Sequence, residues 1–230
     1  MGAVLAILAA GSSSRAGVDK VLAELGGHPV LAWSLASGQA AGCFEEIVVI
    51  APPDKVGRVA AVVRDRLPTA RVVAGGATRT ASSWVALDAA PDADVIAIHD
   101  AARPFAPPGL FVRCVQIARA DGSAVAGLPL ADTVRRADET GSAVEEVERE
   151  GLWSAQTPQV FRRELLERAR AAAGERSFSD DAAALVAAGL RPKMVPGERR
   201  NLKITTLEDL AYARELVDKG LAGIAALQLR

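Results

Sequence analysis

Short runs of nearly continuous apolar residues alternate with amphipathic stretches along the first two-thirds of the chain. The apolar runs occupy residues 3–8, 46–51, 71–74, 94–98 and 124–128. Because neither face of these runs is polar, they predict strands buried on both faces, as in a parallel sheet. Between them, apolar residues recur at helical spacing, as in Val56, Val59, Val63 and Leu67, and in Leu110, Phe111, Cys114, Val115 and Ala118. This alternation predicts βαβ units in a doubly wound α/β sheet.

The pattern changes between residues 130 and 152, where two polar strands flank a turn at Gly141. Such a hairpin has little apolar surface to bury in its own domain, so it either projects into solvent or packs on a second subunit. Helical patterns resume at 161–173 and 180–188, and a last helix begins near Thr206 with Leu210, Ala213, Val217 and Leu221 on one face. The polar segments at residues 151–159, 178–181 and 201–203 look like caps and turns, and Ser179 with the two aspartates after it predicts a helix N-terminus. With about 150 residues per domain as a guide, we expect one domain over residues 1–230 and an arm at about 130–152.

Composition narrows the class of protein. Lysine and arginine number 27 against 28 acidic residues, a net charge of −1, which argues against nucleic-acid binding. The only two cysteines, Cys43 and Cys114, form neither a disulfide framework nor a zinc motif. The apolar residues 3–10 follow no basic segment and are too short to span a bilayer. We therefore expect a cytoplasmic protein without membrane association.

The loop after the first predicted strand carries candidate chemistry. Residues 9–20 are rich in alanine, glycine and serine and include Arg15 and Lys20, one of only five lysines in the chain. The spacing matches neither the dinucleotide glycine fingerprint nor a Walker loop. Ligands bind beyond the carboxyl ends of strands in open α/β sheets, so these residues predict an anion site. The alternative is a flexible loop with two solvated cations.

Two further polar segments follow predicted strands. Residues 74–83 contain Gly75 and Gly76, which allow close approach to a ligand, although a tight turn with a helix N-cap explains them equally well. Asp100 and Arg103 follow another strand, where Asp100 is placed to bind Mg²⁺ or a ribose hydroxyl. The alternative is a loop salt bridge between them. We interpret His99 as a structural histidine and His28 as a surface residue in a turn.

Seven short motifs occur in a fixed order: Ala9-Ala10-Gly11 with Arg15 and Lys20; Gly75-Gly76 with Arg79 and Ser82; Asp100-Ala101-Ala102-Arg103-Pro104; Asp132-Thr133; Arg149 with Gly151-Leu152-Trp153; Thr157-Pro158-Gln159; and Asn201 with Lys203. Each motif alone is common, and the specificity lies in the ordered set. From Ala3 to about Leu216 the chain resembles the 2-C-methyl-D-erythritol 4-phosphate cytidylyltransferases, enzymes of the non-mevalonate isoprenoid pathway. Ser179 stands where this family usually has threonine.

The resemblance implies a fold and a reaction. The fold is a Rossmann-like, mostly parallel sheet flanked by helices, of the nucleotide-diphospho-sugar transferase type, with a β-hairpin arm that interlocks a homodimer. In the reaction, 2-C-methyl-D-erythritol 4-phosphate attacks the α-phosphorus of CTP in the presence of Mg²⁺, and pyrophosphate leaves. The nearest alternative substrate is ribitol 5-phosphate. An alternative of another class is a nucleotide-binding protein that has lost the chemistry.

The resemblance also implies roles for individual residues. Arg15 and Lys20 would stabilise the transition state, and Arg149 and Lys203 would position the polyol phosphate. The nucleotide side would comprise Ala9, Ala10, Gly11, Gly75, Gly76, Ser82, Asp100 and Ala101. The polyol phosphate side would comprise Asp100, Arg103, Thr133, Arg149, Thr157, Ser179 and Lys203, with Asp100 also near the metal.

Overall fold

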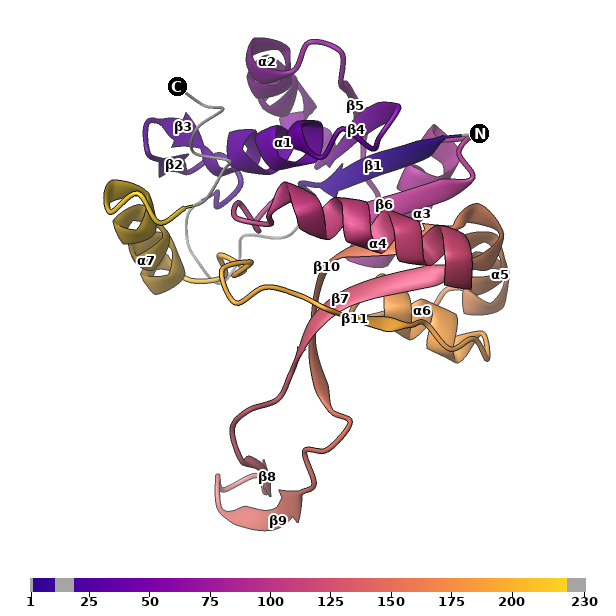
Figure 1. Ribbon diagram of the computed structural model, residues 1–230, viewed down its shortest axis with the longest axis vertical. Helices are drawn as coiled ribbons and strands as arrows, with labels where there is room; N and C mark the ends of the chain where they lie inside the picture. Colours follow the sequence, from indigo (N-terminus) through magenta and orange to yellow (C-terminus); the bar gives the residue numbers. More distant parts are fainter. Residues whose placement is uncertain (1, 11–18, 223–230) are drawn as a thin grey trace.

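The chain folds around one twisted sheet of seven strands in the order β11-β7-β10-β6-β1-β4-β5 (Figure 1). The computed structural model describes residues 2–10 and 19–222. Neighbouring strands pair in parallel except β10, which runs antiparallel to both β6 and β7. This arrangement confirms the predicted α/β class with a mostly parallel sheet.

The elements of the sheet are β1 (Ala3–Leu8), β4 (Glu46–Ala51), β5 (Arg71–Ala74), β6 (Val95–Asp100), β7 (Ser123–Pro129), β10 (Trp153–Arg162) and β11 (Met194–Pro196). Two small hairpins are β2 (Glu24–Leu25) with β3 (His28–Pro29), and β8 (Val134–Ala137) with β9 (Ala143–Val147). The helices are α1 (Val30–Ala40), α2 (Val56–Arg66), α3 (Arg79–Ala89), α4 (Pro108–Asp121), α5 (Arg163–Ala173), α6 (Asp181–Ala187) and α7 (Leu207–Asp218), with one 3₁₀ turn, η1 (Pro53–Lys55).

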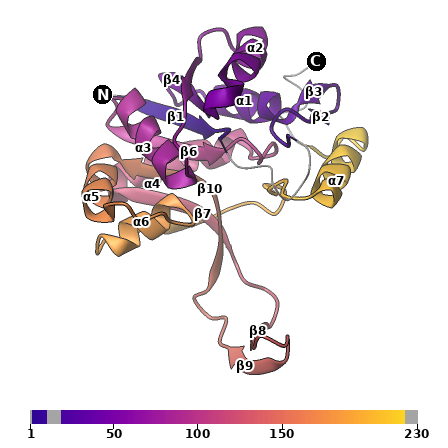
Figure 2. The same cartoon turned by 180° about the vertical axis from the view of Figure 1, so that it is seen from behind.

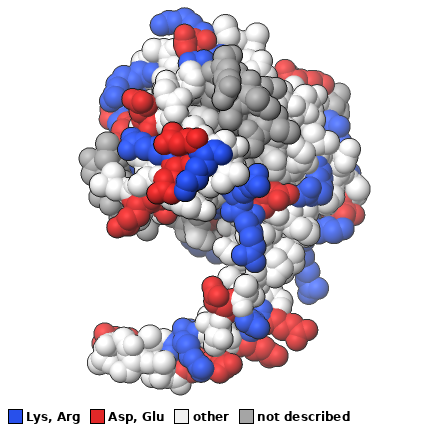
Figure 3. Space-filling model, turned by 60° about the vertical axis from the view of Figure 1, so that its left-hand side comes forward, with Lys and Arg blue, Asp and Glu red and all other residues white. Residues whose placement is uncertain are grey.

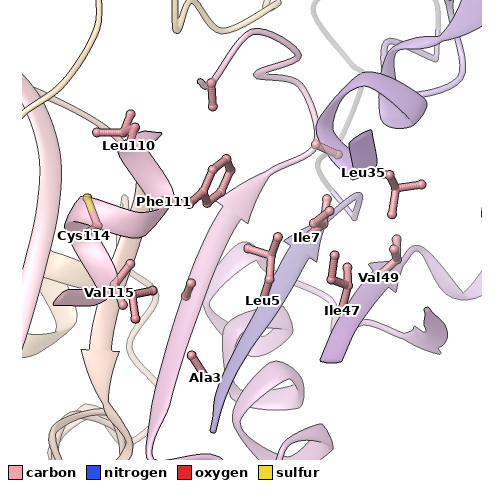
Figure 4. Close-up of a cluster of buried hydrophobic side chains, with 14 of the residues drawn as sticks. Ala3, Leu5, Ile7, Leu35, Ile47, Val49, Leu110, Phe111, Cys114 and Val115 are labelled. Atoms are coloured by element: carbon pink, nitrogen blue, oxygen red, sulfur yellow. The ribbon is translucent and has the colours of Figure 1, made fainter. Parts of the chain in front are cut away.

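Helices cover both faces of the sheet, which explains the apolar character of its strands. On one face residues of α1, α2 and α4 form one buried cluster with Ala3, Leu5 and Ile7 of β1, and Figure 4 shows Leu35 of α1 and Phe111 of α4 in this cluster. On the other face residues of α3, α5 and α6 form a second cluster with the alternate residues of β1 (Figure 2). Because successive side chains of a strand point to opposite faces, a strand enclosed in this way must be apolar throughout.

A third cluster joins the C-terminal helix to the N-terminal half of the chain. Leu210 and Ala213 of α7 are buried with Leu25 of β2 and Trp33 of α1. The Trp33 indole donates a hydrogen bond to the Leu25 carbonyl at 2.9 Å. Thr206 caps α7 as predicted, whereas Leu221 lies beyond its C-terminal end and is exposed. This packing holds the segment that precedes α7 near the carboxyl ends of the strands.

The arm predicted at residues 130–152 projects from the body between β7 and β10 (Figures 1 and 2). Its tip is the β8–β9 hairpin, in which Arg135 and Arg136 pair with Glu146 and Glu145. Val144 at the tip is 60% exposed. On the face shown in Figure 3, basic and acidic side chains are interspersed over both body and arm. Within the described part of the chain, no helix is both long and apolar enough to cross a membrane.

Two elements differ from the sequence expectations. Residues 153–159, interpreted as caps and turns, are most of β10 in the middle of the sheet, and the helical pattern expected from residue 161 begins only at Arg163. The interpretation as caps and turns was wrong because Gln156, Thr157 and Gln159 are polar but buried, each with hydrogen-bond partners from distant segments.

Candidate active site

A cleft of about 420 Å³ opens at the carboxyl ends of β1 and β6. Leu8 and Asp100, the last residues of these strands, are paired neighbours in the sheet, and both line the cleft. The other lining residues come from four segments: Ala10, Lys20 and Val21 after β1; Ala77, Thr78 and Arg79 at the start of α3; Ala102 after β6; and Ser179, Lys203 and Thr205 from the C-terminal part. Five residues predicted from the sequence (Ala10, Lys20, Asp100, Ser179 and Lys203) therefore share one cavity.

Asp100 is the centre of the charges in this cleft. Its Oδ2 lies 2.7 Å from Lys203 Nζ and 3.8 Å from Arg103 Nε, and its Oδ1 lies 3.5 Å from Arg79 Nε. Burial alone would raise the pKa of the Asp100 carboxyl, but Arg79, Lys203 and Arg103 outweigh burial and hold the pKa below its ordinary value. Asp100 is thus an ionised oxygen ligand at neutral pH. The alternative interpretation of an Asp100–Arg103 salt bridge describes only one of its three ion pairs.

The segment that carries Lys203 is fixed by hydrogen bonds to its neighbours. Asn201 is fully buried, and its side-chain amide donates to the Thr157 carbonyl at 2.7 Å and to Gln156 Oε1 at 3.1 Å. Arg103 Nη1 donates to the Asn201 carbonyl at 2.7 Å. These contacts place Lys203 over Asp100. Lys20 lines the same cleft, and its Nζ donates to the carbonyl of Thr205, two residues after Lys203, at 3.4 Å.

A second hollow of about 270 Å³ adjoins the first and shares four residues with it, Arg79, Asp100, Ser179 and Lys203. Its remaining walls include Arg103 and Thr157. The Thr157 hydroxyl accepts from the Asp100 amide at 3.0 Å and lies 3.0 Å from Nδ1 of the fully buried His99. His99 Nε2 lies 3.2 Å from the Arg103 carbonyl, so His99 has the structural surroundings expected for it. The arrangement provides two adjoining pockets that meet at Asp100.

The glycine loop after β5 is shaped by close packing. A Cβ on Gly75 would lie 2.8 Å from Ser82 Oγ and 3.1 Å from the Ala10 Cβ, so a side chain there would displace its neighbours, although Gly75, Gly76 and Ser82 do not themselves line the cleft. The Ser82 hydroxyl accepts from the Gly76 amide at 3.2 Å and donates to the Thr78 carbonyl at 3.0 Å. Thr78 is the N-cap of α3. The turn-and-cap interpretation is therefore confirmed, and the loop still borders the cleft through Ala77 and Thr78.

The remaining predicted residues have different positions. Ala9 and Ala101 are buried beside the cleft, where their amides donate to Ile50 and Leu8 carbonyls. Thr133 and Arg149 lie together on the arm, around a separate hollow of about 330 Å³, and are not brought to Asp100 within one chain. Gly11 and Arg15 lie outside the described residues.

Arg79 is a cleft residue to which the sequence analysis assigned no role. It stands in the second motif, between Gly76 and Ser82, and that position was the available signal. Its Nη2 lies 2.8 Å from Oδ2 of Asp181, a carboxylate that is 2% exposed. The sequence predicts a helix N-terminus at Ser179 and the two aspartates after it, which α6 confirms, but the ion pair of Asp181 with Arg79 had no sequence signal.

The donor set suits a magnesium ion carried by a nucleotide. Within residues 2–10 and 19–222, no group of three or more histidine, cysteine or acidic side chains could enclose a metal. Asp100 supplies a single ionised carboxylate at the cleft. Mg²⁺ typically binds through one or two carboxylates plus substrate phosphates and water, and one carboxylate beside lysines suited to phosphate fits that mode.

Comparison with known proteins agrees with this geometry. Residues 3–219 match the family model described as 2-C-methyl-D-erythritol 4-phosphate cytidylyltransferase. A bifunctional IspD/IspF enzyme of Anaeromyxobacter sp. (strain Fw109-5) is 44% identical over 225 residues, which cover 95% of this chain and 58% of that protein. The chain thus spans little more than half of this bifunctional relative.

Two further proteins match along most of their own length. The 2-C-methyl-D-erythritol 4-phosphate cytidylyltransferase of Deinococcus radiodurans is 43% identical over 213 residues, which cover 91% of this chain and 87% of that protein. The crystal structure of the 4-diphosphocytidyl-2C-methyl-D-erythritol synthase from Anaerococcus prevotii DSM 20548 superposes with a TM-score of 0.82 at 26% identity, covering 94% of this chain and 98% of that one. A chain with these motifs, this cleft and these relatives belongs to the 2-C-methyl-D-erythritol 4-phosphate cytidylyltransferase family.

Proposed function

We propose that the chain transfers the cytidylyl group of CTP to 2-C-methyl-D-erythritol 4-phosphate. A phosphate oxygen of the polyol forms a bond to the α-phosphorus, the bond from that phosphorus to the bridging oxygen of the β-phosphate breaks, and pyrophosphate leaves. The observation that carries the proposal is the convergence of Lys20, Lys203 and ionised Asp100 on one cleft at the carboxyl edge of the sheet. Phosphoryl transfer needs mainly positioning and electrostatic stabilisation from a protein, and this cleft offers both.

Lys20 and Arg15 stabilise the charge that grows around the α-phosphorus. Lys20 supports this role because it lines the same cleft as Asp100 and Lys203. A preorganised cation of this kind contributes about 3–4 kcal/mol to barrier lowering. Arg15 has the same role by resemblance alone.

Lys203 holds the phosphate of the polyol in line with the α-phosphorus. Its ion pair with Asp100 keeps the ammonium group at the junction of the two hollows. Arg103, Thr157 and Ser179 complete the polyol side, since all three line the second hollow. Pyrophosphate and cytidine occupy the first hollow, which Ala10 and Asp100 line. The other residues of the nucleotide side are assigned to CTP by resemblance alone: Ala9, Gly11, Gly75, Gly76, Ser82 and Ala101. Small residues and backbone groups there restrict the base by shape.

We propose that cytidylyl transfer from CTP uses Mg²⁺. Asp100 is the residue that would hold the ion, together with the phosphate oxygens of CTP. When bound, the ion neutralises phosphate charge and supports departure of pyrophosphate. The depressed pKa of Asp100 keeps its carboxylate available for this role across the physiological range.

The working form that we propose is a homodimer of single nucleotidyltransferase domains. Thr133 and Arg149 lie on an arm that projects away from its own cleft, and the arm has no apolar core of its own. In a dimer, each arm supplies these two residues to the other cleft. We place the enzyme in the cytoplasm, in keeping with Cys43 and Cys114, which are both free thiols.

The test is pyrophosphate release from CTP, UTP and ATP with either 2-C-methyl-D-erythritol 4-phosphate or ribitol 5-phosphate. We expect turnover with CTP and the methylerythritol phosphate. Turnover with ribitol 5-phosphate alone would replace the proposed substrate, and a binding isotherm for CTP without any turnover would indicate a nucleotide-binding protein.

A further inference from the structure

Arg79 occupies a position in the cleft that none of the proposed roles explains. It is one of the four residues common to both hollows, and the other three, Asp100, Ser179 and Lys203, already have roles in the proposed reaction. Arg79 is the first residue of α3, directly after the Thr78 cap, and its side chain is 22% exposed. Because Arg79 lies where the two hollows meet, its contacts can affect both of them.

The guanidinium group bridges two carboxylates from different parts of the fold. Nε lies 3.5 Å from Asp100 Oδ1 at the end of β6, and Nη2 donates to Asp181 Oδ2 at 2.8 Å in the first turn of α6. Burial opposes the charge of Arg79, but Asp181 and Asp100 outweigh burial and raise its pKa. A planar fork with several fixed donors can hold two carboxylates at a set separation, which a lysine cannot do.

Asp181 connects this bridge to the polyol side of the cleft. Asp180 caps α6, and Gln159 of β10 accepts from the amides of Asp181 and Ala182 at 3.1 and 3.0 Å. Ser179 immediately precedes this anchored turn and lines both hollows. Gln159 and Thr80 hold this turn from β10 and α3, and Arg79 adds the direct tie between the turn and the Asp100 carboxylate.

We propose that Arg79 is a positioning residue that sets the distance between the nucleotide side of the cleft, at Asp100, and the polyol phosphate side, at the Ser179 turn. This inference rests on the proposed cytidylyl transfer. Arg79 touches Asp100 and Asp181 and acts through them, and its loss misaligns the attacking oxygen with the α-phosphorus.

The kinetic test compares Arg79→Gln, Arg79→Lys, Asp181→Asn and the double variant Arg79→Gln/Asp181→Asn. We expect Arg79→Gln and Asp181→Asn each to lower kcat about tenfold, because the bound polyol phosphate is no longer aligned with the α-phosphorus. The double variant should be no worse than Arg79→Gln, because the effects of contacting charged groups are not additive. Arg79→Lys should recover little, since one ammonium group cannot span both carboxylates. Multiplying effects in the double variant, or full recovery by lysine, would overturn the bridging role.

Arg163 provides a matched control. It is also the first residue of a helix, its side chain is 21% exposed, and it donates to the carbonyls of Leu87 and Ala93, next to the amino end of β6. Arg163→Gln should lower the melting temperature while kcat and KM of the folded enzyme stay at wild-type values. If Arg79→Gln behaves in the same way, Arg79 is structural only and the proposal is wrong.

A second readout tests the bridge without turnover, so that it does not depend on the proposed reaction. Hydrogen exchange at the amides of residues 179–183 should accelerate about tenfold or more in Arg79→Gln, relative to wild type, with exchange in α5 unchanged. Unchanged exchange at residues 179–183 would overturn the bridge. Wild-type protein that lacks turnover but shows this effect would refute the proposed reaction and leave the bridge standing.

Discussion

Lowering the pH should destabilise this protein through one buried histidine, His99. The side chain is fully buried on β6, its Nδ1 lies 3.0 Å from the Thr157 hydroxyl, and its Nε2 lies 3.2 Å from the Arg103 carbonyl. Phe111 covers the ring, with 4.9 Å between the ring centroids. Burial lowers the pKa of His99 to about 4, although the neighbouring Asp100 acts in the opposite direction. The folded state therefore resists protonation at this site.

The sign and size of the effect follow from linkage. In the unfolded chain a histidine has a pKa of about 6.5, so below that pH the unfolded state binds a proton that the folded state excludes. The contribution is fully present above about pH 6.5 and is lost as the pH falls toward 4. From the two pKa values, the loss is about 2 kcal/mol at pH 5 and about 3 kcal/mol below pH 4. That loss is a large part of a typical unfolding free energy of about 5–15 kcal/mol.

The measurement is urea unfolding between pH 7.5 and pH 5, a range in which ordinary carboxyl groups stay ionised in both states. Wild type should lose about 2 kcal/mol of unfolding free energy over this range, and His99→Gln should lose almost none, although it starts lower because its buried hydrogen bonds are altered. The chain has only one other histidine, which makes His28→Gln the natural control. Comparing it with wild type measures how much of the pH dependence comes from the second histidine.

The reasoning is refuted if His99→Gln and wild type lose the same free energy between pH 7.5 and pH 5. It is equally refuted if the His99 ring resonances titrate near pH 6.5 in an NMR experiment on the folded protein. Either result would mean that water reaches the ring or that Asp100 stabilises its charged form more than burial opposes it.

Four further outcomes are expected. Lys20→Ala should lower kcat for pyrophosphate release by roughly 10²–10³ with the melting temperature little changed, and a smaller effect would remove Lys20 from the chemistry. Mixing Lys20→Ala with Arg149→Ala subunits under conditions of exchange should restore about a quarter of wild-type activity, because half of the dimers then hold one intact site; no restoration would show that the arm does not serve the other cleft. Removing divalent ions with EDTA should abolish turnover and Mg²⁺ should restore it, whereas turnover that persists in EDTA would exclude the metal. Phe111→Ala should cost about 3–5 kcal/mol of unfolding free energy, as measured by urea denaturation, because it empties a fully buried site between His99 and Phe44; a cost below 1 kcal/mol would contradict the described packing.

Much of the fold was predictable because its strands are buried on both faces. The apolar runs at residues 3–8 and 46–51 coincide with β1 and β4, which are buried almost throughout because helices cover both faces of the sheet. The run at 71–74 coincides with β5, a partly exposed strand at the edge of the sheet. The arm was equally visible as a polar hairpin with no apolar face. In these cases the polarity of each segment matches its exposure in the folded protein, so the local pattern predicts the structure.

The polar half of β10 could not be recognised in this way. Gln156, Thr157 and Gln159 are tolerated inside the sheet because Asn201, His99 and the first turn of α6 satisfy their hydrogen bonds. None of these partners is near in sequence, so the local pattern of polar residues predicts a loop instead of a strand. For the same reason the sequence could not predict the ion pair of Asp181, because its partner Arg79 lies 102 positions away in the chain.

The sequence by itself determined the α/β class, the alternation of strands and helices in the first half of the chain, and the family, because these depend on local periodicity and on short motifs in order. It also singled out Lys20, Asp100 and Lys203 as chemical candidates. Only the tertiary structure decided that Asp100 stands among three cations, that Arg79 joins it to Asp181, and that Thr133 and Arg149 lie away from their own cleft. Electrostatic effects depend on distance in space and on burial, and both are set by how remote segments pack.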